Sequence, residues 1–262
     1  MSKSNIVELN IIHDHIAFIT LNRPDAAHSL SYALLKELNQ KIKTINHDPN
    51  IYCTIFTGAG EKVFCAGADL KERKNMSGDQ VTKMVKYIDE TMINIEEMSM
   101  PTIAAINGVA YGGGLELALA CDLRIAANHA LMALTETSLG IIPGAGGTQR
   151  LMRLVGIGQA KKIIFTAQPI HAEEALHIHL IEKAVHAKDL RNEVIHLAKM
   201  ITKNGPIALK QAKIAMNQGS DIDLKTGLMI EHHCYQQTIH TEDRVEGLQA
   251  FKEKRIPIFK GK

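Results

Sequence analysis

Residues 101–120 read PTIAAINGVAYGGGLELALA, and this stretch decides the class of fold. Pro101 precedes a short, largely apolar run at 102–106, which ends at the turn pair Asn107-Gly108 and therefore predicts a buried strand. Three consecutive glycines at 112–114 then lead into the strong helix formers that begin at Leu115. A strand that passes through a turn into a helix is the repeating pattern of an α/β protein.

The same alternation continues on both sides of this stretch. Apolar and β-branched runs predict strands at 6–12, 16–21, 51–57, 123–126 and 131–134, with the first two joined as a hairpin by the residues at 13–15. A helix is predicted from about Ser31, because apolar residues recur there at three- and four-residue spacing: Leu34, Leu35, Leu38, Ile42 and Ile45. Ser77 and Gln80 have the spacing of a capping box and predict a second amphipathic helix.

The C-terminal third has a different pattern. From about Gln159 the spacing of apolar residues is helical and predicts no further strand. The clearest break is Asn204-Gly205-Pro206, so we expect a core at 1–204 and a helical C-terminal region at 205–262. A short helical region cannot bury its own apolar residues, and we expect it to pack on the core or on a partner subunit.

Composition limits the kind of protein. The 262 residues are 45% hydrophobic, and the net charge of +2 gives no strong field that would select nucleic acid or an anionic membrane. No apolar run approaches the roughly 20 residues of a membrane helix, and no secretory signal is recognisable at 1–10. The four cysteines form no CxxC pair and three lie in apolar runs, which suits buried thiols in a reducing compartment. We therefore expect a cytoplasmic protein without a metal site.

Two glycine-containing segments can present backbone N–H groups to a ligand. One is FCAGADLK at 64–71, for which a tight turn of small residues is the alternative; the other is the glycine run before Leu115. N–H groups at such a helix start are unpaired and carry the positive end of the helix dipole, so they can stabilise an oxyanion or a phosphate. Neither GxGxxG nor a GK[ST] ending is present, so neither nucleotide fingerprint applies.

Two glutamates are candidates for proton transfer. Glu116 stands among leucines and alanines, and burial there would raise its pKa; the alternative is an acid that faces solvent in the first helical turn. Glu136 lies between a predicted strand and the glycine-rich segment at 140–147; the alternative is a surface acid beside a turn. Two N–H donors and two carboxylates together suit thioester chemistry, in which charge develops on the carbonyl oxygen as an enolate forms.

The chain resembles the crotonase, or enoyl-CoA hydratase/isomerase, superfamily over nearly its whole length. The resemblance runs from the LNRP turn at 21–24 through FCAGADLKE, GGGLELALACD and IIPGAGGTQRL to AFKEKR at 250–255. It implies an α/β spiral of ββα units with C-terminal helices, assembled as homotrimers or paired trimers. It also implies an oxyanion hole at Ala68 and Gly113, with Glu116 and Glu136 as the catalytic pair.

The implied activity is addition of water to an enoyl-CoA thioester, giving a 3-hydroxyacyl-CoA in the breakdown of fatty or branched-chain acyl groups. Retention of both glutamates favours this hydro-lyase activity over the other reactions of the superfamily. Coenzyme A enters as part of the substrate, and no separate cofactor is implied. The implied contacts with the substrate and its coenzyme A are Ala27, Ala66, Asp69, Leu70, Lys71, Gly144, Phe251 and Lys254, the last two from a neighbouring subunit.

Within the superfamily, FCAGADLKER and the tail TEDRVEGLQAFKEKR are most similar to the methylglutaconyl-CoA hydratase branch, which offers an alternative substrate. That branch includes an RNA-binding homologue, so RNA binding is the alternative of another class. The segment 31–47 has only Lys36, Lys41 and Lys43 against Glu37, without interleaved aromatic residues, and this weak basic face favours the enzyme. One departure is His179, where the superfamily usually has glycine; we expect a left-handed helix end there, which histidine tolerates at some cost.

Overall fold

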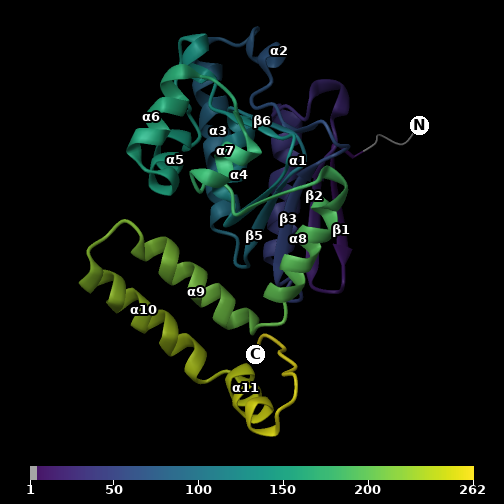
Figure 1. The fold of residues 1–262 in the computed structure, drawn as a ribbon, viewed down its shortest axis with the longest axis vertical. Helices are drawn as coiled ribbons and strands as arrows, with labels where there is room; N and C mark the ends of the chain where they lie inside the picture. Colours follow the sequence, from purple (N-terminus) through teal and green to yellow (C-terminus); the bar gives the residue numbers. More distant parts are fainter. Residues whose placement is uncertain (1–4) are drawn as a thin grey trace.

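The computed structural model describes residues 5–262, which form two β-sheets surrounded by helices, with three C-terminal helices that project from the body (Figure 1). The larger sheet has the strand order β1 (Val7–Ile12), β2 (Ile16–Leu21), β3 (Cys53–Gly58), β5 (Thr102–Ile106), β7 (Leu123–Ala127) and β10 (Lys183–Val185). The smaller sheet has the order β4 (Val63–Cys65), β6 (Val109–Tyr111), β8 (Leu131–Ala133) and β9 (Ile170–His171). Strands β1 and β2 are antiparallel, as are β8 and β9, and the other neighbours are parallel.

From β3 to β8, strands that follow one another in sequence alternate between the two sheets. Each of the pairs β3–β4, β5–β6 and β7–β8 gives one strand to each sheet and is followed by helix, so the body is a spiral of ββα units, as the resemblance implied. The helices of the body are α1 (Tyr32–Asn46), α2 (Leu70–Arg73), α3 (Gly78–Glu96), α4 (Gly113–Ala120), α5 (Gly147–Val155), α6 (Ile157–Thr166), α7 (Ala172–His177) and α8 (Ala187–Ile201). The C-terminal helices are α9 (Pro206–Gly219), α10 (Leu224–Ile239) and α11 (Glu242–Glu253).

The central strands of the larger sheet are buried on both faces, which is why they are largely apolar rather than alternating. All five residues of β5 are buried. Ile103 and Ala105 pack with the face covered by α8, whereas Ala104 and Ile106 belong to the main core on the opposite face. The period of two along the strand therefore sends neighbouring side chains into two different cores.

Several local predictions are confirmed. The hairpin β1–β2 turns through His13 and Asp14, which both have positive φ, and β5 has the predicted bounds. Ser31 caps α1 through Leu34 N, and Ser77 forms a complete capping box with Gln80 at the start of α3. All four cysteines are buried and unpaired. His179 has φ of +60°, the left-handed conformation expected where the superfamily has glycine.

Other predictions fail because the strands concerned are very short. The prediction of no strand after Gln159 is wrong: β9 and β10 lie there, with two and three residues. Strands β4 and β6, three residues each, were also not predicted from the pattern. Such strands are stabilised by neighbours distant in sequence, so they leave almost no local periodicity.

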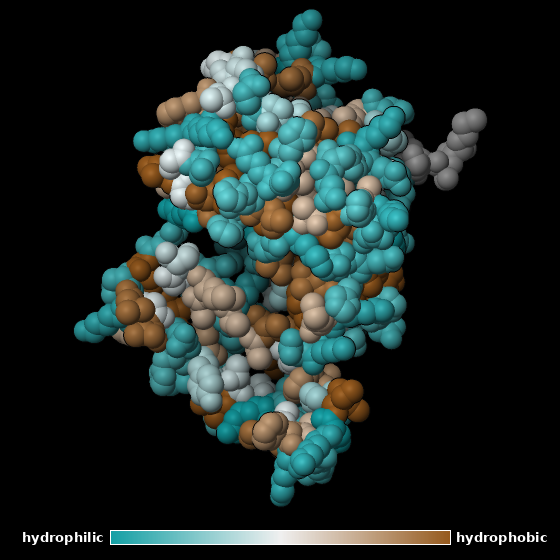
Figure 2. All heavy atoms as spheres, in the orientation of Figure 1, coloured by the Kyte–Doolittle hydropathy of each residue, from teal (hydrophilic) through white to brown (hydrophobic). Residues whose placement is uncertain are grey.

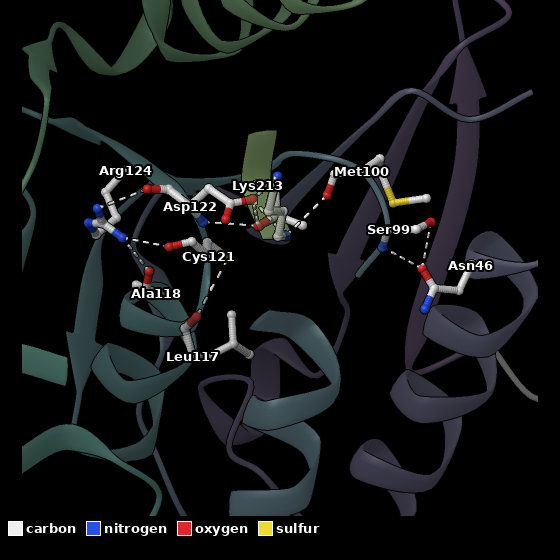
Figure 3. Close-up of polar contacts among 10 residues, drawn as sticks. Asn46, Ser99, Met100, Leu117, Ala118, Cys121, Asp122, Arg124 and Lys213 are labelled. Atoms are coloured by element: carbon white, nitrogen blue, oxygen red, sulfur yellow. Dashed lines mark hydrogen bonds and ion pairs between the residues drawn. The ribbon is translucent and has the colours of Figure 1, made fainter. Parts of the chain in front are cut away.

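Helix α9 is held to the body by a buried lysine (Figure 3). Lys213 Nζ lies 2.8 Å from Asp122 Oδ2 and donates to the backbone oxygen of Met100 at 3.2 Å. Asp122 Oδ2 also accepts from the amide and hydroxyl of Thr102, at 2.7 and 2.9 Å. One charged side chain from the C-terminal region is thus neutralised at the start of β5 and β7.

The C-terminal helices lie at one end of the molecule, below the body in Figure 1. Figure 2 shows hydrophobic residues on their surface and a hollow between them and the body. The exposed apolar side chains there include Met216, Leu224, Leu228, Met229, Tyr235 and Phe251. Among the helices of residues 5–262, none is both long enough and apolar enough to cross a membrane.

Candidate active site

A cavity of about 520 Å³ opens where the two glycine-containing segments meet. Its walls come from α2, α3, the start of α4, and the segment that links β8 to α5. Seven of the residues selected from the sequence line it: Ala66, Ala68, Leu70, Gly113, Glu116, Glu136 and Gly144. The tertiary structure therefore brings together segments that are more than 70 residues apart in the chain.

The backbone amides of Ala68 and Gly113 lie close together at this cavity. On either side of Ala68, the Gly67 oxygen accepts from Leu30 N and the Asp69 amide donates to Leu30 O, so the Ala68 N–H points away from Leu30. A Cβ added to Gly113 would lie 3.6 Å from Ala68 N, which shows how close the two amides are. Gly113 is the first residue of α4, where an N–H has no intrahelical acceptor. Within the described chain neither N–H has a backbone partner.

Gly67 is required for this close approach. Its φ is +89°, and a Cβ there would lie 2.7 Å from the oxygen of Tyr111 and 3.0 Å from Gly113 N. Any other residue would push the two amides apart, because backbone atoms cannot yield as a flexible side chain does. The small residues of FCAGAD thus allow the close backbone approach on which the cavity depends.

Glu116 is buried rather than solvent-facing, with 3% of its surface exposed in a helix whose eight residues are all buried. Its Oε1 accepts from Ala145 N at 2.8 Å and from Gly147 N at 2.9 Å. Burial raises the pKa of Glu116, and these two N–H groups together with the nearby Arg150 charge partly offset the rise. Gly144, which the resemblance implied as a contact of the site, lines the cavity, but the amides that orient Glu116 are those of Ala145 and Gly147.

Glu136 begins the 3₁₀ turn Glu136–Leu139 and lines the cavity, with its carboxylate beside Gly112 at the start of α4. Its Oε2 is buried without a hydrogen-bond partner in the described structure. Burial, with the negative charge of Glu116, raises the pKa of Glu136 to about 7, and the charge of Arg73 acts in the opposite direction. The negative charge of Glu116 therefore favours the protonated form of Glu136.

Arg150 holds the loop that orients Glu116, a role for which no signal was visible in the sequence. Its guanidinium donates to the oxygen of Ala145 at 3.1 Å and pairs with Glu96 of α3 at 2.6 Å. The backbone N–H of Ala145 donates to Glu116, while its backbone oxygen accepts from Arg150. The Arg150–Glu96 ion pair therefore helps to hold the loop that orients the Glu116 carboxylate. The apolar part of the cavity wall was also not predicted from the sequence. It is formed by Val85, Ile88, Leu139, Ile141 and Ile142. For Val85 and Ile88 the sequence showed only that they have helical spacing.

The remaining predicted contacts divide into two groups. Near the cavity, the oxygen of Ala27 accepts from Ala66 N at 3.0 Å, and the exposed Lys71 follows Leu70 in α2. Asp69 is engaged elsewhere: it caps α2 and pairs with Arg23 at 3.1 Å, so its carboxylate is not free for a ligand.

Phe251 and Lys254 are not brought to the cavity of their own chain. Phe251 is 86% exposed on α11, at the opposite end of the molecule from α2 (Figure 1). Lys254 follows α11 in a left-handed conformation. Within one chain, neither residue lines the cavity.

The arrangement suits one kind of chemistry. Two neighbouring N–H groups without backbone acceptors can stabilise negative charge that develops on a carbonyl oxygen. Two carboxyls with raised pKa values face the same space, and groups of that kind transfer protons near neutral pH. Among residues 5–262, no group of three or more His, Cys, Asp or Glu side chains is placed to hold a metal ion.

Comparison with known proteins gives one consistent family. The family model for enoyl-CoA hydratase/isomerase matches residues 12–262. The chain is 54% identical over 249 residues to the "Putative enoyl-CoA hydratase/isomerase YngF" of Bacillus subtilis, and the alignment covers 95% of this chain and 96% of that protein. It is 46% identical over 250 residues to mitochondrial methylglutaconyl-CoA hydratase of Rattus norvegicus, covering 94% of this chain and 79% of the relative. The crystal structure of enoyl-CoA hydratase from Bacillus anthracis superposes with a TM-score of 0.97 at 52% identity, covering 98% of this chain and all of that one.

Proposed function

This chain belongs to the enoyl-CoA hydratase/isomerase family and is a hydratase of that family, and we propose that Glu116 and Glu136 carry out the addition of water. The observation that carries this proposal is that two carboxyls with raised pKa values share one cavity with the paired amides of Ala68 and Gly113. The thioester carbonyl oxygen binds to those amides, which places the adjacent double bond between the carboxyls.

The surroundings of the two glutamates support different roles. Glu116 accepts two N–H bonds, which favour its charged form, so it acts as the base that removes a proton from water as the oxygen bonds to the β-carbon. Glu136 has an unpartnered oxygen and a pKa of about 7, so it holds a proton that it delivers to the α-carbon. Between these two steps negative charge develops on the thioester oxygen, and the amides of Ala68 and Gly113 stabilise it by hydrogen bonds. The product is the 3-hydroxyacyl thioester. Glu116 then carries the proton taken from water and Glu136 is ionised, so transfer of that proton from Glu116 to Glu136 restores the starting state.

The test is hydration of crotonyl-CoA by Glu116→Gln and Glu136→Gln. Each variant should lose about 10²–10⁴-fold in kcat, the usual contribution of a general acid or base. Each should still bind a saturated acyl-CoA, measured by calorimetry, because glutamine keeps the shape of the cavity. Glu97→Gln, at an exposed glutamate outside the cavity, is the matched control. Near-normal turnover in either cavity variant would remove that residue from the mechanism.

We also propose that the chain forms homotrimers or paired trimers through its C-terminal helices. The exposed Met216, Leu224 and Leu228 on α9 and α10 support this, since such side chains seldom remain in water together. Association would bring Phe251 and Lys254 toward the coenzyme A of a neighbouring subunit. Light scattering tests the assembly: a fully active, monodisperse species of 28.8 kDa would contradict it.

The substrate class includes short or branched enoyl thioesters of fatty-acid or branched-chain breakdown, and the cytoplasm is the proposed location. Turnover across a panel of thioesters that includes crotonyl-CoA and methylglutaconyl-CoA ranks these substrates directly. The similarity to the rat enzyme supports including the second, whose acyl group carries a carboxylate.

A further inference from the structure

Glu136 is held in place differently from Glu116. The Glu116 carboxylate accepts two backbone N–H bonds, from Ala145 and Gly147. The Oε2 atom of Glu136 is buried without a hydrogen-bond partner in the part of the chain that the structure describes. Its Oε1 atom lies so close to Gly112 that an added Cβ there would be 2.9 Å away. The position of the Glu136 carboxyl therefore depends on how firmly its own backbone is held.

One hydrogen bond ties the turn Glu136–Leu139 to a distant part of the chain. The hydroxyl of Thr137 donates to the backbone oxygen of Ile164 in α6, at 2.6 Å and across 27 positions. In the described chain, the other hydrogen bonds of residues 136–140 all stay within the segment 135–141. Helix α6 also packs against the turn, so the Thr137 bond fastens the turn to a regular element.

The acceptor of this bond lies at the end of α6, where a helix leaves carbonyl groups unpaired. The helix ends at Thr166, and the last four carbonyl oxygens of a helix have no intrahelical donor. The amide four positions after Ile164, that of Gln168, donates to the Thr166 hydroxyl at 3.4 Å instead. Because Ile164 is buried, a donor from the protein is needed there, and Thr137 supplies it.

Thr137 itself is outside the reaction space. Thr135, Glu136 and Leu139 line the cavity, but Thr137 does not, and its hydroxyl is directed to α6. We propose that Thr137 is a positioning residue for hydration, which holds the turn on α6 so that the Glu136 carboxyl stays where it can reach the α-carbon. This inference rests on the proposed role of Glu136 and adds to it a residue that touches no substrate.

The experiment is hydration of crotonyl-CoA by Thr137→Val, because valine keeps the shape of threonine but cannot donate a hydrogen bond. A displacement of about 1 Å can cost about 10²-fold in rate, so a partial displacement of Glu136 should lower kcat about 10-fold. The KM, and the affinity for the saturated butyryl-CoA measured by calorimetry, should not change. Thr137→Ser should restore kcat, since serine keeps the hydroxyl.

The matched control is Thr166→Val in α6. It removes the same kind of bond, from the Thr166 hydroxyl to the Lys162 oxygen at 2.7 Å, but one that lies within the helix. This variant should keep the wild-type kcat. If it loses as much activity as Thr137→Val, the effect comes from α6 as a whole and the inference is overturned.

A double variant shows whether Thr137 acts through Glu136. In a Glu136→Gln background, Thr137→Val should cause little further loss, because both changes act on one group. A further loss of about 10-fold in that background would overturn the inference, and so would a loss of butyryl-CoA affinity equal to the loss in kcat. If Glu136→Gln is impaired while Thr137→Val has wild-type kcat, the inference alone fails. If Glu136→Gln itself has near-normal turnover, the proposed function of Glu136 fails.

Discussion

Replacing Gly112 with alanine tests whether the position of Glu136 matters to the reaction. Gly112 has φ of +50° and ψ of −123°, a conformation that residues with a Cβ rarely adopt. A Cβ at this position would lie 2.9 Å from Glu136 Oε1. An unstrained contact is about 3.5 Å, so the carboxylate must retreat by roughly half an ångström.

The size of the effect follows from that displacement. A misplacement of about 1 Å can cost about 10²-fold in rate, so half of it is expected to lower kcat about 10-fold. Because a general acid acts in the transition state, kcat and kcat/KM should fall by the same factor. The unfavourable backbone conformation should also lower the free energy of unfolding by about 1–3 kcal/mol.

The assay follows loss of enoyl-thioester absorbance during hydration of crotonyl-CoA, with thermal unfolding measured in parallel. Gly60→Ala is the control for backbone strain, since Gly60 has φ of +79° and no atom within 4 Å of an added Cβ. It should lose stability but keep its kcat. In a Glu136→Gln background, Gly112→Ala should cause little further loss, because both changes act on one group. A folded Gly112→Ala enzyme with wild-type kcat, or the same loss in both backgrounds, would refute the reasoning.

Three further predictions concern Glu136, Lys213 and Gly113. Burial raises the pKa of Glu136 from 4.5 to about 7, so the folded state binds this proton more tightly than the unfolded chain does. The free energy of unfolding of the wild type should therefore fall as pH rises through that interval. Because Glu136→Gln has no such proton to lose, its Tm minus the wild-type Tm should be larger at about pH 8 than at about pH 5. A Tm difference that is the same at both pH values would contradict this. Lys213→Met leaves the Asp122 carboxylate without its cation and should lower the free energy of unfolding, measured by chemical denaturation, by about 3 kcal/mol. The control is Lys210→Met, at an exposed lysine of α9. If the two variants are equally stable, the Lys213–Asp122 ion pair does not hold α9 to the body. Gly113→Pro removes one amide N–H at the first position of α4, where proline is tolerated, and should lower kcat about 10²-fold; a folded variant with full activity would exclude that amide from the oxyanion hole.

Local signals in the sequence were sufficient for the larger elements. Ser31 and the pair Ser77–Gln80 mark helix starts because a cap depends on residues only three positions apart. The strand at 102–106 is visible because a run buried on both faces is largely apolar. The two glutamates and the glycines beside them were selected from motifs and spacing alone, and they do line one cavity.

Tertiary structure decided what those local signals left open. The two sheets exist because short strands such as β4 and β6 pair with partners far away in the chain, and three residues carry too little periodicity to reveal this. The N–H groups of Ala145 and Gly147 orient Glu116 only after α4 and α5 have packed together. Arg73 was not selected as a site residue from the sequence, yet it lines the cavity. Its position there depends on contacts between α2 and segments distant in the chain, which no local pattern records.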